Sequence, residues 1–461
     1  MRLRVDPLKG APGLAPRVRA IPIAIDDPLD RQTDMLPRPL RTTISTLLAL
    51  LFATSLAAQE LPSATPEAVG MSSERLARLS TALEAYVDHG RIPGAVAMVL
   101  RHGKVIYAEA VGDRDAAADS EMRTDAIFRI ASQTKALVSV GIMMLQEDGA
   151  LLISDPVSKY LPSFAKTTVA TRRSGGGYDV VESARPITIR HLLTHTAGIG
   201  YGGGTGGGEW AEAGITGWYF ASREEPVRAT VERMAALPFP AQPGEAFVYG
   251  YNTDILGAVI EEVSGMSLAE FLQNRILDPL DMRDTHFYLP AQKSDRLAAV
   301  YNLNGGQLTR APEGPGMQTQ GQYVNGPRGS YSGGAGLLST ARDYGRFLQM
   351  LLDRGELEGT RLLSPKTVEL MTTDHVGDVY ATAGMGFGLG FQIRLDVGAA
   401  GEPGSVGEFG WGGAYHSTYW VDPLEDLVVV YFTQVIPASG LDDHARLRAL
   451  VYSSILETVP H

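Results

Sequence analysis

The sequence predicts a protein of the α/β class, in its α+β form, with one antiparallel sheet flanked by helices and a mainly helical lobe inserted into it. Residues 94–112 read as two strands joined by a glycine-containing turn. Further strands are expected near the other end of the chain, at about 387–394, 415–421 and 427–434. Helical periodicity fills most of the sequence between them. This order indicates one sheet built from both termini, because a doubly wound fold would alternate strands and helices along the chain.

The helices are predicted from apolar residues that recur at helical spacing. The first covers 72–88 and follows a Ser-Ser-Glu start. The next covers 128–148 and has apolar side chains around almost its whole circumference, which indicates a buried helix. Further helices are expected at 187–194, 225–236, 253–264, 267–275, 339–355 and 442–458. The glycine-rich residues 198–210 and 303–336 are expected to form loops.

Composition narrows the classes of function. The chain has 461 residues, of which 44% are hydrophobic and 20% are charged, as in ordinary globular proteins. Its formal net charge of −12 argues against nucleic acid or an anionic membrane as the main partner. The chain has no cysteine, which excludes thiol nucleophiles, disulfides and cysteine-bound metals. No Gly-Lys-Ser/Thr follows the glycines of 198–210, so they do not predict a phosphate site.

The N-terminus contains the pattern of a secretory signal peptide. Residues 35–41 carry two arginines, 42–56 form a short apolar run, and small residues follow at 57 and 58. We therefore expect residues 35–58 to be a signal peptide, residues 1–34 to be an upstream misannotated segment, and residues 59–461 to be an exported domain, periplasmic or secreted. The apolar run is short for a membrane span, so no stable membrane insertion is expected after cleavage.

The stretch "FRIASQTKALVSVGIMML" at 128–145 raises the first question of chemistry. Ser132 before an apolar run is typical of a helix N-cap, and a capping box would place Glu or Gln three residues later. Lys135 stands there instead, at the positive end of the helix dipole, where a cation costs about 0.3–1 kcal/mol. Since residues three apart share a helix face, the amine can reach the hydroxyl and activate it.

Burial and the helix dipole would both disfavour the ammonium form of Lys135, so we expect its pKa to lie well below the ordinary value of about 10.4. The Ser-x-x-Lys spacing alone is weak evidence, because Ser163 and Lys166 share it. There a proline precedes the serine and no buried helix follows. We therefore expect that second pair to lie on the surface.

The surroundings of Ser132 resemble the serine β-lactamase and penicillin-binding-protein superfamily, in particular class C β-lactamases and family VIII carboxylesterases. The similar segments are 125–162, "ITIRHLLTHTAGI" (187–199), "PGEAFVYGYNTDILGAVIEEVSG" (243–265), "SGGAGLLSTARDYGRFLQML" (332–351) and "GWGGAYHSTYWVDP" (410–423). The resemblance implies an α/β lobe from about 65–125 and 335–461 and a helical lobe of about 126–334. The active site is expected between these lobes.

The resemblance also implies the roles of individual residues. Ser132 is expected to be the acylated nucleophile and Lys135 its base partner. Two tyrosines compete for the second motif; Tyr249, with Gly257 eight residues later, matches the esterase branch better than Tyr251. Tyr251 then takes the position where β-lactamases have asparagine. Either Lys135 or Tyr249 could accept the serine proton.

The third motif, Lys-Thr-Gly in β-lactamases, is here Trp411-Gly412-Gly413. Tryptophan supplies no charge for a β-lactam carboxylate, and Trp-Gly-Gly is frequent in the esterase branch. The backbone N–H groups of Ser132 and Ala414 are expected to form the oxyanion hole. His416 is expected either to face the pocket or to be a hydrogen-bonded structural histidine.

The expected function is hydrolysis of short-chain carboxylic esters, small-molecule substrates, through an acyl-enzyme. No Gly-x-Ser-x-Gly is present, which disfavours an α/β-hydrolase. "HLLTH" at 191–195 lacks the glutamate of a zinc-binding His-Glu-x-x-His, so neither a metal nor a cofactor is expected. A β-lactamase, a D-amino peptide hydrolase and a non-catalytic penicillin-sensing protein stay as alternatives, and the oligomeric state stays open.

Overall fold

The computed structural model describes residues 60–459. The predicted upstream segment 1–34 and signal peptide 35–58 lie outside the described residues. From Glu60 onward the chain forms one compact unit. Among the helices of this part, none is long and apolar enough to cross a membrane.

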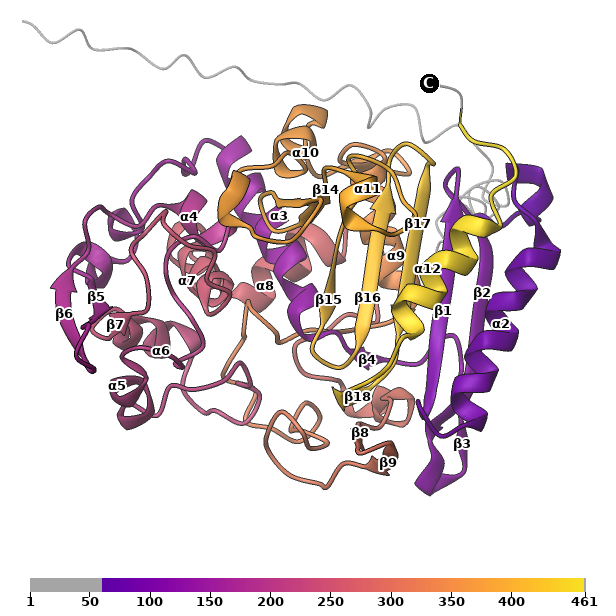
Figure 1. Cartoon of the computed structure of the whole chain (residues 1–461), viewed down its shortest axis with the longest axis horizontal. Coiled ribbons are helices and arrows are strands. Elements are labelled where there is room, and N and C mark those ends of the chain that lie inside the picture. Colours follow the sequence, from indigo (N-terminus) through magenta and orange to yellow (C-terminus); the bar gives the residue numbers. More distant parts are fainter. Residues whose placement is uncertain (1–59, 460–461) are drawn as a thin grey trace, which may run out of the picture. The chain divides into compact units, whose positions relative to one another are not determined.

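The central feature is an eight-stranded sheet whose neighbouring strands are all antiparallel (Figure 1). Its order is β13-β14-β15-β16-β17-β1-β2-β3. The strands are β1 (Gly94–Arg101), β2 (Lys104–Asp115), β3 (Ser120–Glu121), β13 (Met385–Phe387), β14 (Gln392–Arg394), β15 (Phe409–Gly413), β16 (Ser417–Asp422) and β17 (Leu427–Phe432). The pairing of β1 with β17 joins the two ends of the chain, which confirms the predicted antiparallel sheet.

Both faces of the sheet are covered by helices. The side chains of β1 alternate between two cores: Val96 and Met98 belong to the core on one face, while Ala95 and Ala97 belong to the core on the other. Burial on both faces explains why this strand reads as an unbroken apolar run. Helices α2 (Ser73–Asp88) and α12 (Asp443–Ser453) cover the outer face, and α9 (Ala341–Leu352) packs on the inner face (Figure 1).

The chain between the two halves of the sheet is mainly helical. Its helices are α3 (Thr134–Glu147), α4 (Ile189–Leu193), α5 (Gly207–Glu212), α6 (Val227–Met234), α7 (Asn252–Ser264) and α8 (Leu268–Leu272), and a π-helical turn, Gln273–Leu277, follows the last. Helices α10 (Pro365–Met371) and α11 (Val397–Ala400) come later in the chain. Smaller sheets comprise β5 (Thr168–Arg172), β6 (Tyr178–Glu182) and β7 (Pro238–Phe239); β8 (Tyr301–Asn304), β9 (Gln307–Arg310) and β18 (Val435–Ala438); β4 (Phe128–Arg129) and β10 (Leu338–Ser339); and β11 (Glu356–Leu357) and β12 (Thr360–Arg361).

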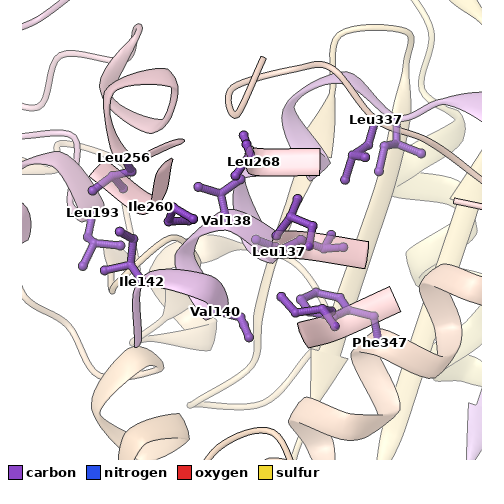
Figure 2. Packing of buried hydrophobic residues seen from close by; sticks show 14 of the residues in the cluster. Leu137, Val138, Val140, Ile142, Leu193, Leu256, Ile260, Leu268, Leu337 and Phe347 are labelled. Atoms are coloured by element: carbon purple, nitrogen blue, oxygen red, sulfur yellow. The ribbon is translucent and has the colours of Figure 1, made fainter. Parts of the chain in front are cut away.

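Helix α3 lies at the centre of the inner core. Every residue from Thr134 to Leu145 is buried. Figure 2 shows Leu137, Val138, Val140 and Ile142 of this helix among apolar side chains of other elements, which are Leu193, Leu256, Ile260, Leu268, Leu337 and Phe347. This packing confirms the buried helix that the sequence predicts, and it holds the start of α3 in a fixed position.

Several expected boundaries are wrong, including the C-terminal end of the helix expected at 442–458, which ends at Ser453, and the loop expected at 303–336, which contains β9. The helix expected from residue 128 begins only at Thr134, because Phe128–Arg129 pairs as a strand with Leu338–Ser339. The strand expected at 387–394 is a hairpin of two short strands, β13 and β14. The loop expected at 198–210 contains the first turn of α5. At Phe128–Arg129 a pairing partner more than 200 residues away overrides the local helical pattern.

Candidate active site

Ser132 lies in a short 3₁₀ turn, Ala131–Gln133, between β4 and α3. Ala131 has a φ of 43°, a left-handed conformation that costs a non-glycine residue energy. Two hydrogen bonds fix this turn. Tyr344 donates its hydroxyl to the backbone carbonyl of Gln133 (2.9 Å), and the side-chain amide of Gln133 donates to Ser417 Oγ (3.1 Å). No side chain caps the start of α3. The alternative that Ser132 merely caps the helix is therefore wrong.

Lys135 is buried, with 2% of its surface exposed, and its Nζ contacts three oxygen atoms. These are Ser132 Oγ (3.3 Å), Tyr201 Oη (3.1 Å) and the Gly334 carbonyl (2.6 Å). An ammonium group has three N–H donors and no acceptor, so this arrangement suits the protonated form. The expected contact between lysine and serine is present, and it is made by a charged donor.

The expectation of a low lysine pKa is wrong. Burial by itself lowers the pKa of Lys135, but electrostatic interactions with Tyr201, Tyr249 and Asp254 outweigh burial, and the pKa lies above its ordinary value. Asp254 is itself buried, accepting hydrogen bonds from Ser332 Oγ (2.6 Å) and the Gly334 amide (3.1 Å). It thus also fixes the peptide segment whose carbonyl binds Lys135.

Tyr201 is a site residue that sequence reasoning missed. It lies in the glycine-rich loop after α4, contacts Lys135 and lines the cavity beside Ser132. Burial raises the pKa of its phenol, so the hydroxyl stays protonated at neutral pH. The available signal was a single aromatic residue among glycines, directly after the "HTAGI" segment.

Tyr249 and Trp411 contact each other near Lys135. The Trp411 indole Nε1–H donates a hydrogen bond to Tyr249 Oη (3.0 Å), and the ring centroids lie 5.4 Å apart. Lys135 Nζ lies 4.7 Å from the centroid of the Tyr249 ring, within the range of a cation–π contact. The indole and the ammonium are both groups that stabilise negative charge on a phenolate oxygen.

Tyr251, the competing tyrosine, does not line the cavity. It is fully buried, stacks on Trp210 at 5.8 Å and donates its hydroxyl to the Gly217 carbonyl (2.6 Å). The prediction of Tyr251 as a substrate-binding residue is therefore wrong. The reason is geometric: the chain enters α7 at Asn252, and this turn directs neighbouring tyrosines to different surroundings.

Strand β15 leaves part of its edge open to the cavity. Strand β14 pairs with it only at Gly410 and Phe409, so in the part of the chain that the structure describes the stretch 411–413 has no strand partner on that side. The turn after β15 presents the amide of Ala414. Within residues 60–459, neither this amide nor that of Ser132 has a hydrogen-bond acceptor. Two free backbone donors beside a serine hydroxyl are the arrangement that an oxyanion hole requires.

Gly413 brings this strand close to the turn that contains Ser132. A Cβ atom at this position would lie 2.5 Å from the Ile130 carbonyl oxygen, in the backbone that leads into the Ser132 turn. Replacing Gly413 by alanine is therefore expected to push Ala414 away from Ser132 and to lower kcat by about 10- to 100-fold with less effect on KM, since 1 Å of misplacement costs about this much. Steady-state kinetics measures this effect, and Gly407→Ala is the control that shows how much replacing a glycine outside the site changes kcat. An unchanged kcat in Gly413→Ala would contradict the expectation.

The cavity that contains Ser132 has a volume of about 690 Å³. Its lining includes most of the predicted site residues, namely Ser132, Tyr249, Trp411, Gly412, Gly413, Ala414 and His416. Lys135 lies directly behind Ser132. His416 belongs to the turn after β15, with its Nε2 hydrogen-bonded to the buried Asp443 (2.7 Å). The cavity combines a serine, an adjacent buried ammonium, two tyrosine hydroxyls and free backbone amides.

A family model described as β-lactamase matches residues 79–453 of this chain. The chain belongs to the β-lactamase family. Esterase EstB of Burkholderia gladioli is 31% identical over 383 residues, covering 80% of this chain and 93% of that protein. Lovastatin esterase of Penicillium rubens is 30% identical over 400 residues, covering 78% of this chain and 94% of that protein.

A solved structure agrees with the fold. EstCE1, described as a hydrolase with promiscuous acyltransferase activity, matches with a TM-score of 0.71 and 30% identity, covering 82% of this chain and 99% of that one. These comparisons confirm that the chain belongs to the serine β-lactamase and penicillin-binding-protein superfamily and that it resembles the family VIII esterases. They also confirm the β-lactamase/transpeptidase-like fold. These relationships support a serine hydrolase activity.

Proposed function

We propose that this protein is a serine carboxylesterase that cleaves short-chain esters through an acyl-enzyme on Ser132. The observation that carries the proposal is the hydrogen-bonded pair of Tyr249 and Trp411 beside Ser132 and Lys135. In this position an indole, which is neutral, takes the place of the lysine of the β-lactamase motif. The names of the related esterases from Burkholderia and Penicillium agree with it. The signal-peptide pattern further supports action after export.

In acylation, Ser132 Oγ forms a bond to the ester carbonyl carbon while its proton passes to a base. We assign the role of that base to Tyr249, because the contacts of Lys135 Nζ suit an ammonium, and the Trp411 indole N–H donates a hydrogen bond to the Tyr249 oxygen. The carbonyl oxygen becomes an oxyanion against the amides of Ser132 and Ala414. Collapse of the tetrahedral species breaks the bond to the alcohol oxygen, which leaves with the proton held by Tyr249.

Deacylation repeats these transfers with water. Tyr249 accepts a proton from water as the water oxygen attacks the acyl carbon, and the proton then passes to Ser132 Oγ as the acid leaves. Lys135 stays charged in both half-reactions. Its three hydrogen bonds hold Ser132 Oγ and Tyr201 in place, and its charge offsets the negative charge that develops on serine and tyrosine.

The neutral side chain of Trp411 favours an esterase over a β-lactamase or a D-amino peptide hydrolase. A β-lactam or a C-terminal peptide carries a carboxylate, and a neutral indole offers it one N–H donor, already engaged by Tyr249. A charged donor to a carboxylate contributes more than a neutral one, by about 1 kcal/mol or more. This difference favours simple esters over β-lactams and D-amino peptides.

Purified residues 59–461 with p-nitrophenyl butyrate test the proposal. Steady release over many turnovers is expected, with a butyryl group found on Ser132 by peptide mass mapping of quenched enzyme. A single stoichiometric burst without turnover would instead indicate a penicillin-sensing acyl acceptor. Faster cleavage of a cephalosporin than of any simple ester would refute the preference for esters.

A further inference from the structure

The position of Tyr249 shows where the alcohol part of an ester leaves the site. In the reaction proposed above, this tyrosine gives its proton to the alcohol oxygen, so the alcohol must lie beside Tyr249 Oη. That oxygen is 3.0 Å from the indole nitrogen of Trp411. Both residues line the cavity together with Ser132. The alcohol therefore leaves along the stretch 411–413 of β15, whose edge on the side of β14 has no strand partner among the described residues.

The cavity continues from this stretch onto the outer face of the sheet. Phe409 and Trp411 direct their side chains to the inner core, so Gly410 and Gly412 face the opposite side, because successive positions in a strand alternate. Trp420 of the neighbouring strand β16 belongs to the outer core and lines the same cavity. Since neither glycine has a side chain, the outer face of β15 is open at this place. A group that passes Gly412 meets space.

Four charged side chains line this outer part of the cavity. They are Arg394 of β14, Arg448 of α12, Glu402 after α11 and Glu408 before β15. Each arginine lies within 3.7 Å of both glutamates. The four charges therefore cancel, and a charged ligand would have to compete with these ion pairs. The outer part of the cavity favours a neutral group.

The ion pairs leave several hydrogen-bonding groups unused. Arg394 is 2% exposed, and its Nε and Nη1 have no acceptor within residues 60–459. The indole nitrogen of Trp420 also lacks an acceptor there. Glu402 is 48% exposed, so its carboxylate can accept further hydrogen bonds. Because a buried donor without an acceptor is destabilising, a ligand with oxygen atoms at this place would offset that cost.

Building on the esterase function proposed above, we propose that the enzyme selects esters of polyhydroxylated alcohols, such as acylated sugars, whose alcohol part lies in the outer part of the cavity. A hydroxyl group both donates and accepts hydrogen bonds. Several hydroxyls on one ring therefore use the arginine and indole donors and the glutamate acceptors together. Such a group is neutral, as the four paired charges require.

The test compares methyl 6-O-butyryl-α-D-glucopyranoside with cyclohexylmethyl butyrate. Both are butyrate esters of a CH₂ group attached to a six-membered ring, and they differ in the oxygen atoms of the ring and its substituents. The release of butyrate is followed in a pH-stat. In the unmodified enzyme kcat/KM is expected to be at least about tenfold higher for the glucoside, mainly through a lower KM, because hydrogen bonds to charged groups hold the sugar.

Glu402→Ala removes an acceptor from the outer part of the cavity. Since this side chain is half-exposed, the variant is expected to fold like the unmodified protein. The ratio of the two kcat/KM values is expected to fall about fivefold, the size of a lost hydrogen bond to a charged group. Glu356→Ala is the matched control, because Glu356 is also partly exposed and paired with an arginine, but lies on β11 and does not line the cavity. It is expected to leave the ratio unchanged.

Gly412→Val tests the path of the alcohol. The added methyl groups narrow the opening to the outer part of the cavity, so kcat/KM for both ring esters is expected to fall about tenfold relative to that for ethyl butyrate. Equal kcat/KM values for the two ring esters in the unmodified enzyme, or no cleavage of the glucoside, would overturn the proposal. An unchanged ratio in Glu402→Ala or in Gly412→Val would do the same. Absence of p-nitrophenyl butyrate turnover would contradict the esterase function itself, so the two failures are distinguishable.

Discussion

Replacing Ser132 by alanine is expected to lower kcat/KM for p-nitrophenyl butyrate by at least about 1,000-fold. The variant lacks the atom that is proposed to form the acyl-enzyme, and what would remain is the binding and oxyanion stabilisation that serine hydrolases keep without their nucleophile. The loss of one methylene-bound hydroxyl from a half-buried position has little effect on packing. The melting temperature is therefore expected to change by no more than a few degrees, which circular dichroism checks alongside the kinetics.

The chain contains a matched control for this substitution. Ser163 and Lys166 have the same spacing, but they lie on the surface, in and after the 3₁₀ turn Pro162–Ala165. Ser163→Ala is expected to keep full activity under the same assay. If the Ser132 variant kept turnover within tenfold of the unmodified enzyme, the nucleophile would have to be sought among other residues of the cavity.

The fold was predictable where the pattern of apolar residues in the sequence matches the faces of the strand or helix that are buried. The apolar runs of β1 and β17 appear in the sequence because both faces of these strands are buried, and the helical periodicity of α2 appears because only one of its faces is. The start of α3 was not predictable, since Phe128–Arg129 becomes a strand only by pairing with Leu338–Ser339. A local pattern cannot reveal a partner of that kind.

The candidate site also contains some residues that the sequence reveals and others that it does not. Ser132, Lys135 and Tyr249 are visible through spacing and through resemblance, and all three meet at one end of the cavity. Tyr201 was not visible, because its role comes from the fold of a glycine-rich loop over Lys135. The charge state of Lys135 was misjudged for a related reason. Local sequence shows its burial, whereas the acceptor carbonyl comes from Gly334, 199 residues later.

The protonated state of Lys135 also has a consequence for stability. A folded-state pKa above the ordinary 10.5 means that protonation of this lysine stabilises the folded protein at neutral pH. This contribution is complete below the unfolded-state pKa and is lost as the pH rises through the folded-state pKa. Lysine at this position is thus compatible with burial because Gly334, Tyr201 and Asp254 compensate for the lost water.

Replacing Lys135 by methionine is expected to lower kcat for p-nitrophenyl butyrate by about 1,000-fold or more, with a smaller change in KM. Methionine has a similar length and fills the site without charge, so Ser132 Oγ and the Tyr249 oxygen lose the nearby ammonium when negative charge develops on them. Groups that act as one unit with a nucleophile cause losses of this order when they are removed. Single-turnover and steady-state kinetics separate the acylation step from binding.

Lys166→Met is the corresponding control, since that lysine is exposed and stands at the same spacing from the surface serine Ser163. It is expected to retain activity.

The pH dependence of the unmodified enzyme distinguishes two roles for Lys135. If it acts as a fixed cation, no lysine-dependent limb appears between pH 6 and 9 that Lys135→Met removes. If such a limb were present, Lys135 would be neutral in the active form and would itself accept the proton of Ser132. Tyr249 would then deliver protons to the leaving alcohol, and the three acceptors around Nζ would no longer explain the chemistry.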